Sequence, residues 1–72
     1  MIGTITRHDP IGAEKAAADA ESHGAPVIGI TCSGSTWYVF IRVPTLRIRH
    51  RVESSVGVIT ISRGCNEDPE SV

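Results

Sequence analysis

Long hydrophobic runs are missing from this sequence of 72 residues. The longest uninterrupted apolar run covers residues 37–41, whereas a membrane-spanning helix needs about 20 apolar residues. The first seven residues alternate isoleucine and threonine, and they lack the charged start and apolar core of a signal peptide. We therefore expect a cytoplasmic protein that has no membrane anchor.

Cysteine is also scarce, because the sequence holds only Cys32 and Cys65, without CxxC spacing. Two cysteines are too few for the disulfide framework that stabilises a small secreted protein. We expect two reduced thiols; one disulfide or a metal site are the alternatives. Cys32 lies in an apolar segment, which favours a buried, inert thiol over a nucleophile.

The short length excludes a multi-domain enzyme, since chains divide into separate cores only at much greater length. Hydrophobic residues make up 40% and charged residues 21%, a balance typical of soluble globular domains. We expect one α+β domain over residues 1–64. The C-terminal residues 65–72 show no apolar periodicity and are predicted to form an acidic, flexible tail.

Charge is distributed unevenly, although the formal net charge is only −1. Residues 42–63 contain five arginines and a single carboxylate, a net charge of +4. The arginines are Arg42, Arg47, Arg49, Arg51 and Arg63. The segments on either side are acidic, so the sequence predicts an electrostatic dipole with one basic surface.

One helix is predicted by its end signals and its alanines. Asp9 can cap the first amide groups, and Pro10 suits the first helical position because it has no N–H to leave unpaired. Gly24 can adopt the left-handed conformation that ends a helix, and Pro26 prevents its continuation. Ala13, Ala16, Ala17 and Ala20 form an apolar stripe at helical spacing.

The rest of the chain is predicted to be strands. We expect strands over residues 1–7, 27–32, 36–43, 46–52 and 56–62, with a hairpin turn at 33–35. Trp37, Val39, Ile41 and Val43 should face the core. The expected order is β-α-β-β-β-β, an antiparallel sheet with one alanine-rich helix on one face.

An open sheet face is the predicted functional site. On the strand 36–43 this face would present Tyr38, Phe40 and Arg42. On the strand 46–52 the same face would present Arg47, Arg49 and Arg51, which alternate with Leu46, Ile48, His50 and Val52. Such a surface suits carboxylates of a protein partner, or phosphates with bases stacked on the aromatic rings. The alternative is a solvated strand whose charges protect a sheet edge.

Enzymatic chemistry has little support in the residues. His8, His23 and His50 are far apart in sequence, and we expect His50 on the inward side of the arginine-rich strand. Asp19 and His23 are four residues apart, a spacing that can chelate a metal but that an ion pair near the helix end explains better. We therefore expect no enzyme, no cofactor and no metal site.

A family resemblance rests on the alanine-rich helix and on the segments after it. Residues 9–18 read Asp-Pro-Ile-Gly-Ala-Glu-Lys-Ala-Ala-Ala, and the chain continues with Gly24-Ala25-Pro26, an apolar hairpin and Pro44-Thr45-Leu46-Arg47. Over about residues 9–48 the chain resembles certain small phage-encoded anti-CRISPR proteins, which inhibit type I surveillance complexes. The resemblance implies a stoichiometric inhibitor in the bacterial host cell that binds a subunit of a CRISPR-Cas complex and has no catalytic motif.

The sequence thus leads to two hypotheses. The first is a small protein-binding inhibitor, monomeric or homodimeric, whose contact surface is Tyr38, Phe40, Arg42, Arg47, Arg49 and Arg51. The alternative is a binder of single-stranded nucleic acid that uses the same residues, with phosphates on the arginines and bases on the aromatic rings. Salt dependence separates the two, because phosphate contacts release counterions.

Overall fold

The computed structural model describes residues 1–62, which form four strands and two helices in the order β-α-β-β-α-β. The expected α+β class is confirmed, whereas the order β-α-β-β-β-β is wrong. The strands are β1 (Ile2–Arg7), β2 (Val27–Ser33), β3 (Thr36–Arg42) and β4 (Thr60–Ser62), and the helices are α1 (Pro10–Ser22) and α2 (Leu46–Val56). The predicted tail, residues 65–72, lies outside the described residues.

Helix α1 begins and ends where its capping residues predict. The Asp9 side chain accepts a hydrogen bond from the Gly12 amide, and Pro10 occupies the first turn. At the other end Gly24 has φ +96°, and the Ala25 amide donates to the Ala20 carbonyl at 2.9 Å. A second bond joins Gly24 to the Glu21 carbonyl at 3.1 Å, which completes a Schellman motif.

Strands β2 and β3 form the predicted hairpin. Ser33 pairs with Thr36, so only Gly34 and Ser35 lie in the turn. Gly34 has φ +63°, and a positive φ at the first of two turn residues is typical of the type II′ turn. Its backbone twist matches that of the flanking strands, which explains why the chain reverses within two residues.

Helix α2 replaces the predicted arginine-rich strand and the turn at 53–55, and this is the main correction. The predicted last strand, 56–62, is shortened to β4 (Thr60–Ser62). Thr45 caps the helix, since its Oγ1 accepts a hydrogen bond from the Ile48 amide at 3.2 Å. Ile48, Val52 and Val56 lie four residues apart, so the segment carries a helical apolar stripe as well as an alternating pattern. Val52 and Val56 are buried, which shows that packing selects the helical stripe.

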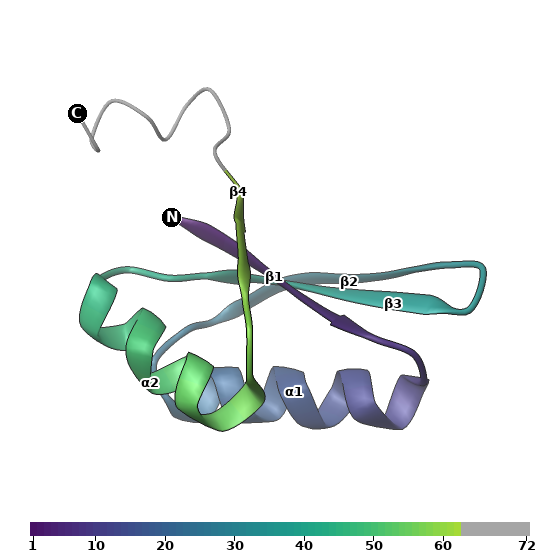
Figure 1. Ribbon diagram of the computed structural model, residues 1–72, viewed down its shortest axis with the longest axis horizontal. Helices are drawn as coiled ribbons and strands as arrows, with labels where there is room; N and C mark the ends of the chain where they lie inside the picture. The colour runs from purple at the N-terminus through teal and green to yellow at the C-terminus, as the bar shows by residue number, and fades with distance from the viewer. Residues whose placement is uncertain (63–72) are drawn as a thin grey trace.

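The sheet order is β2-β3-β1-β4, and all neighbouring strands are antiparallel. Figure 1 shows α1 and α2 on the same side of β1, β2 and β3. Strand β1 lies between β3 and β4 and does not pair with β2. This element order is that of split β-α-β, or ferredoxin-like, domains. Two strands distant in sequence, β1 and β3, form the centre of the sheet.

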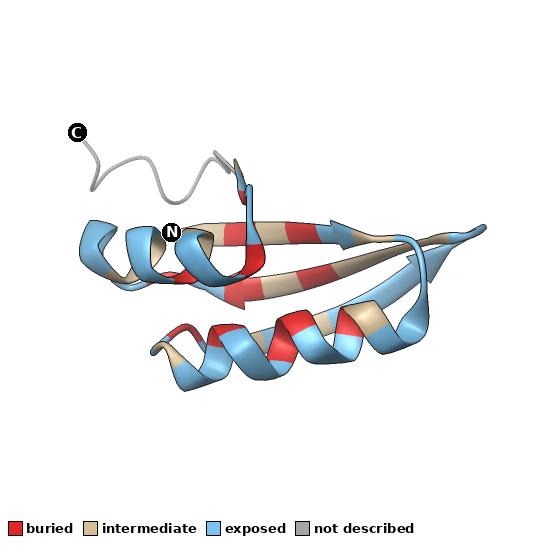
Figure 2. Ribbon diagram, turned by 60° about the horizontal axis from the view of Figure 1, so that its bottom comes forward, coloured by how far each residue is buried: buried red, intermediate tan, exposed pale blue. Residues whose placement is uncertain are grey.

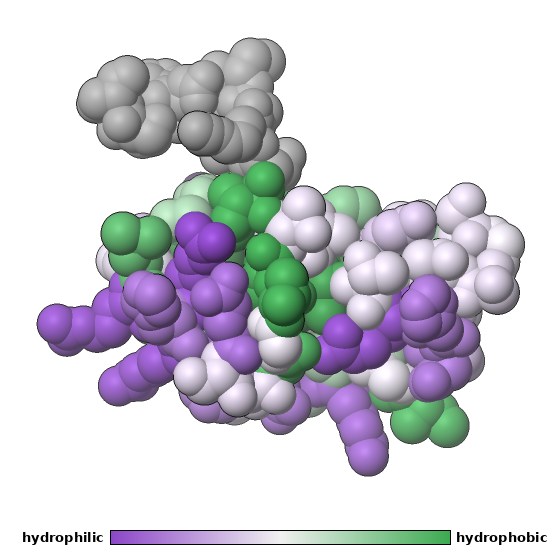
Figure 3. All heavy atoms as spheres, viewed as in Figure 1, coloured by the Kyte–Doolittle hydropathy of each residue, from purple (hydrophilic) through white to green (hydrophobic). Residues whose placement is uncertain are grey.

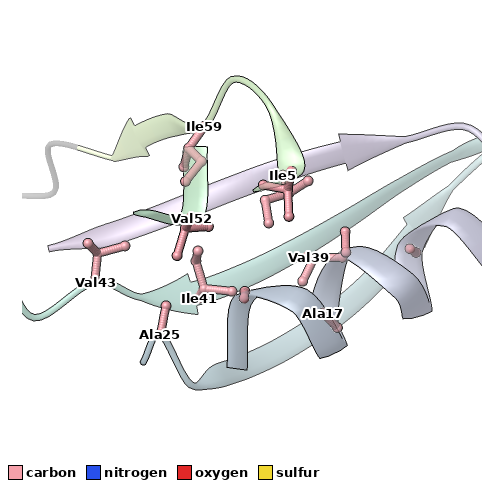
Figure 4. Packing of buried hydrophobic residues seen from close by; sticks show 12 residues of the cluster. Ile5, Ala17, Ala25, Val39, Ile41, Val43, Val52 and Ile59 are labelled. Carbon is pink, nitrogen blue, oxygen red and sulfur yellow. The ribbon is translucent and has the colours of Figure 1, made fainter. Parts of the chain in front are cut away.

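Both helices cover the same face of the sheet. Ile5 on β1 lies opposite Val39 on β3, and both side chains are fully buried in one cluster with Val52 of α2 and the alanines of α1 (Figure 4). Figure 2 shows that the buried positions of α1 face the strands, while its outer side is exposed. The predicted alanine stripe is confirmed: Ala13, Ala16, Ala17 and Ala20 are all buried. Of the four residues predicted to face the core from 36–43, Val39, Ile41 and Val43 are fully buried and Trp37 is partly buried.

Candidate functional site

The opposite face of the sheet carries the sheet-face site, by which we mean Tyr38, Phe40 and Arg42 on β3. These residues alternate with the fully buried Val39 and Ile41, so they point away from both helices. Tyr38 and Phe40 are half-buried and Arg42 is exposed. The prediction that these three side chains share the open face is confirmed.

Strand β1 supplies the neighbours of the sheet-face site. Thr4 pairs with Phe40 and Thr6 pairs with Tyr38, while Ile2 pairs with Arg42. Paired residues share a face, so short threonines flank both aromatic rings and leave them accessible. Within residues 1–62 no strand contains a carboxylate, so nothing on this face neutralises Arg42.

The remaining predicted site residues lie elsewhere. Arg47, Arg49 and Arg51 are on α2, which packs on the other side of the sheet, so the predicted continuous arginine and aromatic surface is split in two. Side chains of a helix spread around its axis instead of alternating between two faces. The site on the open face therefore keeps one arginine of the predicted four.

The three α2 arginines differ in their surroundings. Arg49 pairs with Glu53 one turn later, with Nε 3.2 Å from Oε2. Arg47 and Arg51 are exposed, also one turn apart, and form no ion pair within residues 1–62. Together with the exposed His50 they form what we call the α2 ridge. Figure 3 shows hydrophilic side chains projecting on the left of the molecule, where Figure 1 places α2.

Three predictions about single residues are wrong. His50 is exposed and does not point inward, because the segment is a helix. The Cys32 thiol is exposed and not buried, since β2 is an edge strand. The His23 Nδ1 atom lies 2.9 Å from the Asp19 backbone carbonyl oxygen, so the expected ion pair with the Asp19 carboxylate does not form. Cys65 lies outside the described residues, so its pairing stays a prediction.

Within residues 1–62, no three side chains of His, Cys, Asp or Glu are grouped as metal ligands would be. Neither α1 nor α2, the two helices of the described residues, is long and apolar enough to span a membrane.

Sequence reasoning missed one structural contact and one exposed edge. Arg7 was not assigned a role, yet its Nη2 atom donates to the Val56 carbonyl at the end of α2. Strand β2 was not recognised as a sheet edge, although Ile28 and Ile30 are 55% and 43% exposed. Its lack of any charged residue was the signal available in the sequence, but only the strand order reveals which strand is at the edge.

Comparison with known proteins identifies no relative: no family model, no curated protein and no solved structure matches this chain.

Proposed function

We propose that this chain is a small non-enzymatic protein that inhibits a larger assembly by binding one of its protein subunits through the sheet-face site. The observation that supports the proposal is the composition of that site. Tyrosine, phenylalanine and arginine are enriched in the energetically important centres of protein interfaces, whereas lysine and carboxylates are depleted there. Tyr38, Phe40 and Arg42 meet this description on an uncovered sheet face.

The partner is proposed from the sequence resemblance. Residues 9–48 resemble phage anti-CRISPR proteins, so we propose a subunit of a type I CRISPR-Cas surveillance complex in the bacterial cytoplasm. In the structure these residues run from the cap of α1 through the hairpin to the first turn of α2. They include the whole sheet-face site. A stoichiometric inhibitor needs no catalytic group, only a surface that is complementary to its target.

The test is binding of the tagged protein to a purified, nuclease-treated type I surveillance complex. The variant Tyr38→Ser/Phe40→Ser removes both rings from the open face and should lose binding. The matched control, Arg47→Ala/Arg51→Ala, changes two exposed residues on the other side of the sheet and should bind normally. If only the α2 variant loses binding, the contact surface is the α2 ridge and the sheet-face assignment is wrong. If the unaltered chain does not bind, this partner is wrong.

A second candidate function is binding of single-stranded nucleic acid, and one observation favours it. Tyr38 and Phe40 stand two residues apart on a central strand of a four-stranded antiparallel sheet, with threonines opposite them and Arg42 next on the same face. Sheet-based RNA binders stack successive bases on aromatic side chains placed in this way. Each stacked base contributes about 1–3 kcal/mol.

Salt titration with a fluorescent oligonucleotide distinguishes the two functions. Affinity for nucleic acid should fall as salt rises, with a slope set by the number of phosphates contacted. Since Arg42 is the only described cationic side chain on the open face, that slope should be shallow, and Arg42→Ala should flatten it further. Absence of oligonucleotide binding at low salt, together with nuclease-resistant capture of the protein subunit, favours the inhibitor.

A further inference from the structure

Within the described residues 1–62, strand β2 forms the longer of the two edges of the sheet. It has seven residues, whereas β4 at the opposite edge has three. Within residues 1–62 it pairs only with β3, so a row of its backbone N–H and C=O groups faces outward without a strand partner. Such a row is a template for another β-strand.

The usual protections of a sheet edge are missing from most of β2. Its sequence, Val-Ile-Gly-Ile-Thr-Cys-Ser, contains no charged residue and no proline. One irregularity occurs between Val27 and Gly29, at the start of the strand, and the pairing with β3 is regular from Gly29 to Ser33. Natural edge strands that must stay unpaired generally carry a lysine, a proline or a central bulge.

The apolar side of the sheet also continues to this edge, where Ile30 is only partly covered. Ile30 lies directly opposite Val39, so both side chains are on the side of the sheet that the helices pack against. Val39 is fully buried, whereas Ile30 is 43% exposed. Helix α1 therefore covers the core completely at Val39 but leaves Ile30, one strand further out, partly exposed.

We propose that the β2 edge pairs with the β2 edge of a second copy of this chain, giving an antiparallel two-fold dimer with one continuous sheet. A β-strand is the occupant that can pair with the whole row of outward backbone groups at once. An uncharged strand meets its own copy without like-charge repulsion, and it offers no charge by which to select a different partner. The two Ile30 side chains then extend the core across the junction. Because a two-fold interface uses the same surface of both copies, pairing leaves neither β2 edge free for a third copy.

The first test is the molecular mass in solution across a dilution series, measured by sedimentation equilibrium. The unaltered chain should approach twice 7.7 kDa at high concentration. Ile30→Lys places a charge at the junction and should remain at the monomer mass. The matched control, Ile11→Lys, makes the same change at a residue of α1 that is 68% exposed and should dimerise normally. A chain that stays monomeric throughout, or an Ile30→Lys variant that still dimerises, overturns the proposal.

The second test does not depend on whether Ile30→Lys folds. An antiparallel pair related by a two-fold axis perpendicular to the sheet places one residue opposite its own copy, at a Cβ separation of about 5 Å. Single cysteines placed in turn at each position of β2, each in a chain without other cysteines, should therefore include one that rapidly forms a disulfide-linked dimer on mild oxidation. A single cysteine at the exposed position 11 is the control. If none of these single-cysteine variants crosslinks faster than the control, β2 does not pair with its copy.

Discussion

Arg7, the last residue of β1, donates a hydrogen bond from Nη2 to the carbonyl oxygen of Val56, the last residue of α2, at 2.6 Å. Its Nη1 atom donates to the Thr6 carbonyl at 2.8 Å, which fixes the direction of the guanidinium. The end of a helix carries unpaired carbonyl groups and a partial negative charge, so a cation there is favourable. This contact attaches the end of α2 to a central strand that is 49 residues away in sequence.

Replacing Arg7 by alanine should lower the free energy of unfolding by about 1–2 kcal/mol, because the change removes a charge-assisted hydrogen bond and a favourable charge at the helix end. Urea denaturation measures the loss. Arg51→Ala is the matched control, since Arg51 is exposed and forms no ion pair within residues 1–62. Equal stability of the two variants would show that the contact with Val56 contributes nothing.

Thr45→Ala should cost about 1 kcal/mol of stability, because the Thr45 side chain accepts the hydrogen bond from the Ile48 amide that begins α2. Thermal or urea unfolding followed by circular dichroism measures this change. Ser54→Ala, at an exposed position inside α2, should leave stability almost unchanged. The pair also tests the helix itself: a strand over residues 46–52 would give Thr45 no capping role, and the two substitutions would then have similar effects.

Gly3→Ala should destabilise the protein by about 1–3 kcal/mol through overpacking. A Cβ atom at this position would lie 2.6 Å from Ile59 Cγ2 and 3.4 Å from side-chain atoms of Ile41 and Val43. Combining it with Ile59→Ala should cost less than the sum of the single changes, which a double-mutant cycle measures. Gly29→Ala is the control, because its Cβ would meet only Phe40 Cδ2, at 3.9 Å, and its effect should be small. Strict additivity of Gly3→Ala and Ile59→Ala would contradict the predicted clash.

Val52→Ala and Leu46→Ala should differ in cost although both change an aliphatic residue of α2. Val52 is fully buried, so its truncation should cost about 2 kcal/mol, whereas Leu46 is 58% exposed and its truncation should cost less than about 0.5 kcal/mol. Denaturant midpoints compare the two directly. A strand with the alternating pattern would place both residues on one inward face, so similar costs would favour that interpretation again.

The first 43 residues were largely predictable because their signals are local. Asp9 and Pro10 begin α1, Gly24 ends it, and Gly34 provides the positive φ of the hairpin turn. Each of these residues acts within a few positions of itself, so no knowledge of the rest of the chain is needed.

Residues 46–56 were predicted wrongly because their sequence supports two periodicities. Arginines at every second position indicate a strand, whereas Ile48, Val52 and Val56 at every fourth position indicate a helix. Gly24, just past the end of α1, lies beside Ile48 of α2, since a Cβ on Gly24 would be 3.0 Å from Ile48 Cδ1. This contact joins two segments that are distant in sequence, so local patterns cannot predict it.

The candidate site also has one part that local sequence determines and one part that tertiary packing determines. The sequence by itself determined that Tyr38, Phe40 and Arg42 share one face of β3, because side chains alternate in any strand. Only the tertiary structure decided that Arg47, Arg49 and Arg51 leave that face, that β2 is the exposed edge and that Arg7 caps α2. Those features depend on which distant segments pack together, and burying the apolar stripe of α2 against α1 and the sheet favours the helix over the local alternation.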